Sequence, residues 1–156
     1  MAEHPALAGR AVILASWAGT AAFGVTVGLA AAGVDALSYA SVVLPLVLFA
    51  ASIPISLYAL ARAAVRTARG GERITVSGLF FLRGSAPAPV RRLLLGSLVA
   101  AVVVTMATAS AEPYGVLVPV YPLALCGLWA AAHGTFPLIP EPAPPPRVKS
   151  GDDSAG

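Results

Sequence analysis

Residues 62–92 read RAAVRTARGGERITVSGLFFLRGSAPAPVRR, and this stretch decides how the rest of the chain is arranged. Its charge is one-sided, because seven arginines stand against a single acid, Glu72. The arginines are Arg62, Arg66, Arg69, Arg73, Arg83, Arg91 and Arg92. A basic loop between long apolar segments is typical of the cytoplasmic side of a membrane protein. We therefore predict that residues 62–92 form a cytoplasmic loop whose arginines bind anionic lipid.

The composition of the whole chain indicates the same class of protein. Of its 156 residues 58% are hydrophobic and 11% are charged, whereas a soluble domain carries about 25% charged residues. An all-α integral membrane protein is therefore expected. A nucleic-acid partner is not expected, because such proteins interleave aromatic and basic residues. The only aromatics of the loop, Phe80 and Phe81, lie in an apolar cluster.

Four apolar segments are long enough to cross a bilayer. At 1.5 Å per residue, a span of about 20 residues crosses a hydrocarbon core of about 30 Å. The first segment is also longer than the 7–15 apolar residues of a signal peptide. The predicted spans cover about residues 11–32, 37–61, 93–111 and 114–132.

The charges outside the spans predict how the chain is threaded. Arg10 lies in the short segment 1–10, and Arg147 and Lys149 follow the last span. The two remaining turns contain the acids Asp35 and Glu112 and no Lys or Arg. The positive-inside rule therefore predicts an in-out-in-out-in topology with both termini in the cytoplasm.

The first and third spans carry small residues at every fourth position. These are Ser16, Thr20, Gly24, Gly28 and Ala32 in the first span and Ser97, Ala101, Thr105 and Ala109 in the third. Lipid tails provide little hydrophobic force between helices, so small residues stabilise helix pairs by allowing close approach. We expect both faces to be helix-packing surfaces, which suits contact between the two spans. The spacing leaves open whether they pack within one chain or between chains.

The basic loop has internal structure of its own. Arg62, Arg66, Arg69 and Arg73 are spaced for one helix face, so the second span should continue as a basic stalk to Gly70-Gly71. Residues 74–82 then read ITVSGLFFL, which begins with the alternation of a short strand. Its apolar end consists of Leu79, Phe80, Phe81 and Leu82. This cluster is too short to span, and we predict an interfacial segment, with a partner-docking patch as the alternative.

Prolines and aromatic residues mark further features. The second span contains Pro45 and Pro54, and the fourth contains Pro119 and Pro122. These prolines are expected to kink the helices. Tyr39, Tyr114 and Trp129 lie near span ends and suit the aromatic belt of a membrane protein. The proline-rich segment 133–156 is predicted to be a disordered cytoplasmic tail.

Several kinds of chemistry are absent from the predicted spans. No Asp, Glu, Lys, Arg or His lies inside any span, and such residues normally mark proton relays and ion sites. The few acids and histidines are scattered, and Gly70-Gly71 lacks the spacing and lysine of a phosphate loop. The single cysteine, Cys126, cannot form an internal disulfide and is expected to pack as a small apolar residue. We therefore expect no catalytic residue, no metal, no cofactor and no enzymatic activity.

Three stretches carry a resemblance to a known group of proteins. They are 127–137, GLWAAAHGTFP; 81–87, FLRGSAP; and the pair Arg91-Arg92 before the third span. In these stretches the chain resembles small, functionally uncharacterised four-span integral membrane proteins of actinobacteria. The resemblance implies a bacterial plasma-membrane protein and brings no catalytic residue or activity with it.

Two functions from different classes fit these features. The first is a non-enzymatic accessory or scaffold subunit that packs against other membrane proteins or against itself, as the small-residue faces and the apolar cluster suggest. The alternative is a lipid-handling or neutral-solute permeation protein, built on proline-kinked spans around a site without charges. Membrane lipids are partners in both.

Overall fold

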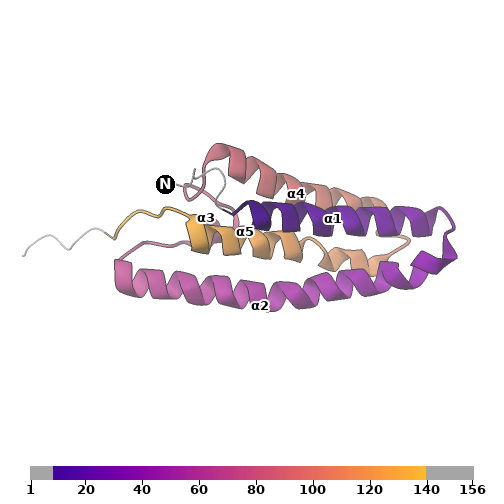
Figure 1. The fold of residues 1–156 in the computed structure, drawn as a ribbon, viewed down its shortest axis with the longest axis horizontal. Coiled ribbons are helices and arrows are strands. Elements are labelled where there is room, and N and C mark those ends of the chain that lie inside the picture. The colour runs from indigo at the N-terminus through magenta and orange to yellow at the C-terminus, as the bar shows by residue number, and fades with distance from the viewer. Residues whose placement is uncertain (1–8, 140–156) are drawn as a thin grey trace, which may run out of the picture.

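The computed structural model describes residues 9–139 as a bundle of helices (Figure 1). They are α1 (Arg10–Ala31), η1 (Asp35–Leu37), α2 (Ser38–Gly70), α3 (Val76–Phe80), α4 (Ala88–Thr108), η2 (Pro113–Leu117) and α5 (Val120–His133), where η marks a 3₁₀ helix. Four helical segments are long and apolar enough to cross a membrane: Arg10–Ala31, Asp35–Gly70, Ala88–Thr108 and Pro113–His133. Within the described residues, this confirms the all-α class with four helices of membrane-spanning length.

Helix α2 is the longest helix and extends past its predicted span. Its 33 residues correspond to about 50 Å at 1.5 Å per residue, well beyond a hydrocarbon core of about 30 Å. Its C-cap, Gly71, has a φ of +62°, a left-handed conformation that glycine adopts without strain. The prediction that this helix continues as far as Gly70-Gly71 is thus confirmed, although Arg73 lies beyond the end of the helix. Both Pro45 and Pro54 lie inside this helix, which continues through them (Figure 1).

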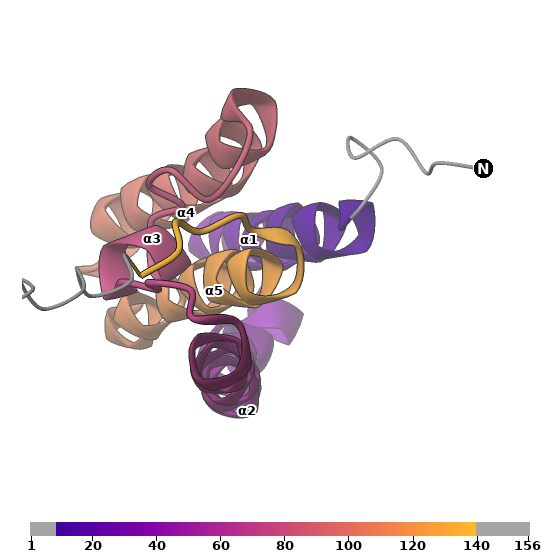
Figure 2. The same ribbon diagram turned by 90° about the vertical axis from the view of Figure 1, so that its left-hand side faces the viewer.

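Helix α5 forms the centre of the bundle. It contacts α1, α2, α3 and α4, and the view along the bundle shows these helices around it (Figure 2). Of the most apolar part of Pro113–His133, 56% is buried, against 28%, 22% and 28% for the other three spanning segments. In the other three segments less than a third of this part is buried, which is expected where lipid covers a helix.

The predicted span 114–132 is not one continuous α-helix. Helix η2 comes first, and α5 begins at Val120, directly after Pro119. Proline is tolerated there, because the N–H groups in the first turn of an α-helix have no partner within the helix. Pro119 and Pro122 therefore mark the start of α5 and do not kink a longer helix.

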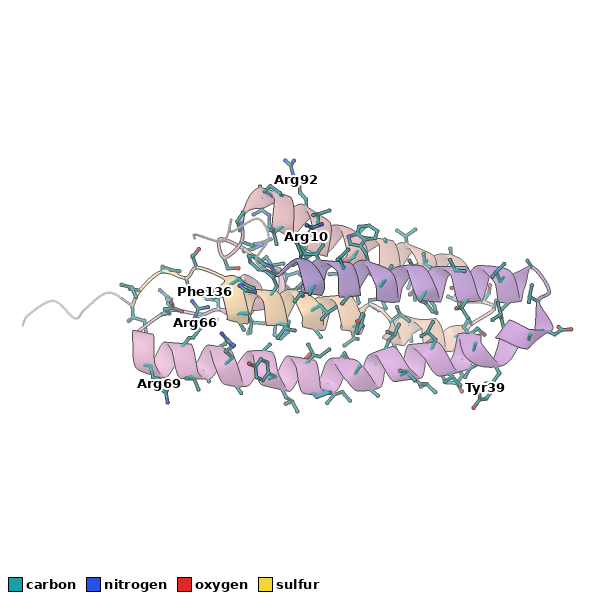
Figure 3. The ribbon with its side chains drawn as sticks, in the orientation of Figure 1. Arg10, Tyr39, Arg66, Arg69, Arg92 and Phe136 are labelled. Carbon is teal, nitrogen blue, oxygen red and sulfur yellow. The ribbon has the colours of Figure 1, made fainter. Side chains whose placement is uncertain are left out.

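The described charges divide between the two ends of the bundle. One end, here termed the arginine end, holds the start of α1, the C-terminal part of α2, α3 and the start of α4. The other, termed the acidic end, holds the turns at η1 and η2 with Asp35 and Glu112. Figure 3 shows Arg66 and Arg69 at the first end and Tyr39 at the second. The two groups of charges thus lie far apart along the bundle.

Within residues 74–82, Val76–Phe80 form the short helix α3 and not the strand that the alternation suggests. The side chain of Thr75 accepts a hydrogen bond from the N–H of Gly78 at 3.1 Å and so caps α3. Threonine at this position satisfies a free N–H group of the first helical turn, which favours a helix over a strand. Leu82 follows at a φ of +52° and is fully buried.

The chain after α5 is held against the loop that follows α2. The N–H of Arg73 donates to the carbonyl of Pro137 at 2.8 Å, and the N–H of Ile139 donates to that of Gly71 at 2.7 Å. The N–H of Thr135 donates to the carbonyl of Ser85, in the loop before α4, at 3.0 Å. Residues 133–139, predicted to be disordered, are therefore ordered by backbone hydrogen bonds and by the last turn of α5. The rest of that predicted tail, 140–156, lies outside the described residues.

Candidate functional site

The two predicted small-residue faces meet between α1 and α4. The hydroxyls of Ser16 and Ser97 form a hydrogen bond at 2.6 Å, and both residues are fully buried. Thr20 is buried on the same face of α1, and Ala101 and Thr105 are buried on α4. These five members of the predicted packing faces therefore pack within the chain.

The remaining members of the two faces lie nearer the acidic end and are more open. Gly24 is half-buried, and a Cβ added there would lie 3.8 Å from the nearest side-chain atom, an ordinary contact. Gly28 is exposed, and nothing lies within 4 Å of an added Cβ. Ala32 and Ala109 are exposed as well. The predicted face of α1 thus divides into a buried half and an open half.

The apolar cluster 79–82 lies largely inside the bundle. Leu79 and Leu82 are buried in the core at the arginine end. Phe80 packs against α5, where a Cβ added at Gly127 would lie 2.7 Å from its ring. Phe81 is exposed. The interfacial position stays a prediction for this cluster, and in this fold Phe81 is the member with surface free for it.

Two single residues of α5 lie in the same core. Cys126 is fully buried, which confirms its prediction as a packing residue. Trp129 was expected in an aromatic belt, and this is wrong, because it is only 2% exposed. The reason is the central position of α5, which no single span reveals. Tyr39 and Tyr114, the other two aromatics of the predicted belt, are exposed at the acidic end.

Arg66 differs from the other arginines of the loop because it points into the protein. Its guanidinium forms an ion pair with Glu72, with Nε–Oε2 and Nη2–Oε1 distances of 2.8 and 2.9 Å. It also donates to the carbonyls of Ala131 at 3.2 Å and Gly134 at 2.9 Å. Its Cζ lies 5.3 Å from the ring centre of Phe136, a cation–π distance (Figure 3). These contacts, termed the Arg66 clamp, join the end of α2 to the end of α5.

The other six arginines of the loop remain on the surface. They are Arg62, Arg69, Arg73, Arg83, Arg91 and Arg92. Arg62 donates to the hydroxyl of Tyr58 at 3.1 Å, on the same exposed face of α2. The basic surface predicted for anionic lipid therefore keeps six members, because the donors of Arg66 are used within the protein.

Glu112 turns into the protein at the acidic end. The residue is 8% exposed, and the Ser41 hydroxyl donates to its Oε2 at 2.8 Å. A cavity of about 210 Å³ lies beside the carboxylate, between α1, α2 and the turn that follows α4. Sequence reasoning placed Glu112 in an outer turn and gave it no role. The residues that enclose Glu112 are remote in the chain, so the sequence does not reveal its burial. Its position directly before a proline is the one local feature that sets it apart.

Comparisons with known proteins add no name to these features. No protein-family model matches the chain, and comparisons with curated proteins and with solved structures found no match. Among residues 9–139, no three His, Cys, Asp or Glu side chains are grouped as a metal site requires. What the fold defines is a class: a four-helix protein compatible with a multi-pass membrane protein, with oppositely charged ends.

Proposed function

We propose that this protein is a non-enzymatic accessory or scaffold subunit of a bacterial plasma membrane. It binds a transmembrane helix of another polypeptide through the open half of the α1 face, formed by Gly24, Gly28 and Ala32. The observation that carries this proposal is Gly28, which is exposed and has open space around it.

Gly28 is an open glycine in the last turn of α1, which ends at Ala31. Glycine destabilises a helix interior by about 0.5–1 kcal/mol relative to alanine, which is an upper limit for Gly28 near the helix end. Among the described residues, nothing lies within 4 Å of a Cβ added at Gly28. In lipid, a glycine of a GxxxG pair lets a second backbone approach closely. The buried serine pair shows that α1 already uses its other small residues in this way toward α4. A second helix on the Gly28 side would extend the same packing.

In this proposal the arginine end lies in the cytoplasm. The six exposed arginines of the loop would then meet the anionic inner leaflet, where each basic residue contributes about 1 kcal/mol near the surface. The acids Asp35 and Glu112 would lie at the outer face, as the positive-inside rule expects. The complex is therefore oriented by charge and joined by helix packing.

The alternative, a permeation protein built on kinked spans, has less support. Helix α5 fills the centre of the bundle, and 56% of the most apolar part of Pro113–His133 is buried. Pro54 is exposed and Pro119 lies before the start of α5, whereas Pro45 and Pro122 are fully buried in the packed bundle.

The test compares Gly28→Leu with Ala22→Leu in the same helix. Ala22 is also exposed, and it lies about a third of a turn around the helix from Gly28 at 3.6 residues per turn. We expect Gly28→Leu to weaken the complex at least tenfold, about 1.4 kcal/mol, and Ala22→Leu to leave it unchanged. The complex is measured by mass after purification from native membranes in mild detergent.

Thermal unfolding of both variants is the control for folding. Leucine at position 28 has free space, so both variants should unfold like the natural protein. An unchanged complex in Gly28→Leu would count against the proposal, as would a purified protein that carries no partner chain at all.

A further inference from the structure

The cavity at the acidic end has mostly apolar walls and one polar wall. Most of its lining is small or apolar, from Val27, Ala30 and Ala31 of α1 and Ala111 after α4. Ser38, Ser41 and Glu112 supply its polar groups. With about 210 Å³ it is smaller than a drug-sized pocket of about 300–1,000 Å³. It has room for one small chemical group.

The carboxylate of Glu112 enters this cavity without a cationic partner. The residue is 92% buried, since 8% of its surface is exposed. Among the described residues the one ion pair is Arg66–Glu72, at the opposite end of the bundle. Burying a charged carboxylate is costly unless it is paired and hydrogen-bonded. A positive group at this position would remove that cost.

The hydrogen-bond donors of the cavity are also too few. Ser41 Oγ lies 2.8 Å from Glu112 Oε2 and 2.8 Å from the carbonyl of Ser38. A serine hydroxyl has one proton, so it cannot donate fully to both acceptors. The second carboxylate oxygen, Oε1, has no protein donor among the described residues, and it is not one of their buried unpaired atoms, so it is open to a ligand or to water. The cavity therefore contains more hydrogen-bond acceptors, from Glu112 and Ser38, than the one hydroxyl donor of Ser41 can satisfy.

The missing features point to one kind of ligand. A primary ammonium group has a positive charge and three N–H donors, and its hydrogen bonds to a carboxylate are charge-assisted. Calcium takes 6–8 oxygen ligands and magnesium an octahedral set, more than one carboxylate and two serines provide. The apolar walls fit the methylene groups next to an amine.

We propose that this cavity binds a primary ammonium group. The group comes either from the headgroup of an aminophospholipid or from a small soluble amine. The cavity lies where α1 ends at Ala31 and α2 begins at Ser38. A helix of 22 residues reaches about 33 Å at 1.5 Å per residue, so this end lies at headgroup depth. This site is separate from the open face of α1 around Gly28.

The experiment measures lipid binding to the full-length protein in detergent by native mass spectrometry. The probes are phosphatidylethanolamine, phosphatidylcholine and phosphatidylglycerol with identical chains, which differ in the N–H donors of the headgroup. We expect phosphatidylethanolamine to bind at least tenfold more tightly than the other two, the effect of about one charge-assisted hydrogen bond. Glu112→Gln should reduce the preference below twofold. Asp35→Asn, which neutralises the exposed acid at the same end, should retain it.

A second arm identifies the source of the amine. If free ethanolamine raises the melting temperature of the natural protein and of Asp35→Asn but not of Glu112→Gln, while the lipids bind equally, the ligand is a soluble amine. If neither the lipid nor ethanolamine responds to Glu112→Gln, the proposal is overturned.

A second variant covers the case in which Glu112→Gln fails to fold. Ala31→Leu adds bulk at the cavity wall and keeps the carboxylate. It should abolish the same preference for the amine, and a preference that survives in Ala31→Leu overturns the proposal.

Discussion

Replacing Arg66 with glutamine should destabilise the protein by about 2–3 kcal/mol. A hydrogen bond to a charged group contributes about 1.5–3 kcal/mol, and breaking a buried ion pair costs about 3–5 kcal/mol. The Arg66 clamp contains the ion pair with Glu72 and two bonds to carbonyls of α5. The two charged side chains are 26% and 22% exposed, so water can replace part of the loss. The value therefore lies below the sum of the individual bonds.

Arg69→Gln is the matched control for this change. Arg69 lies one helical turn further along α2, is exposed and forms no hydrogen bond with the described residues. The two substitutions remove the same charge from the same end of the bundle. A surface substitution of this kind changes stability by about 0.5 kcal/mol or less. A difference between the variants thus reports the clamp and not the net charge.

Cys126 makes the assay specific. It is the single cysteine of the chain and is 0% exposed, so a fluorogenic maleimide reacts only when the core opens. At about 2–4 °C per kcal/mol for a chain of this size, Arg66→Gln should lower the melting temperature by about 4–12 °C and Arg69→Gln by about 2 °C or less. Equal shifts would refute the reasoning. Glu72→Gln completes a double-mutant cycle, which should show coupling between the two side chains.

Two further substitutions test helix packing with the same thiol assay. Ser16→Ala and Ser97→Ala should show a coupling of about 0.6 kcal/mol, the average for interhelical hydrogen bonds in a membrane, and strictly additive effects would contradict the 2.6 Å bond. Gly127→Ala should cost about 1–3 kcal/mol by overpacking, because its Cβ would lie 2.7 Å from the Phe80 ring. Gly24→Ala, with its nearest contact at 3.8 Å, is the control and should cause no loss. A stable Gly127→Ala would show that the Phe80 ring can move aside.

Much of the fold could be predicted from the sequence because the relevant signals are local. Apolar length predicts the spanning helices, and the arginine spacing with Gly70-Gly71 predicts where α2 ends. The prediction failed where a local pattern has two readings. Residues 74–77 alternate like a strand, but Thr75 caps a helix. Pro119 could kink a helix or begin one, and here α5 begins after it.

The candidate sites were harder to predict because they depend on neighbours that are remote in the chain. Ser16 and Ser97 belong to faces that spacing alone identified, and both are buried. The same spacing also covered Gly28, which is open. From the sequence, Glu112 is simply a residue of a turn, because Ser41, its hydrogen-bond partner, lies 71 positions away. No local sequence pattern predicts a contact between residues so far apart in the chain.

By itself the sequence determined that the chain has four apolar helices of spanning length and that its described charges gather at opposite ends. Both follow from hydropathy and charge, which each residue carries regardless of its neighbours. Only the tertiary structure decided that α5 is central, that Arg66 turns inward while Arg69 stays outside, and that Phe23 and Val27 of α1 are buried while Gly28 is open. These outcomes depend on which helices touch and at what rotation, because burial is a property of the whole packed bundle and not of any single segment.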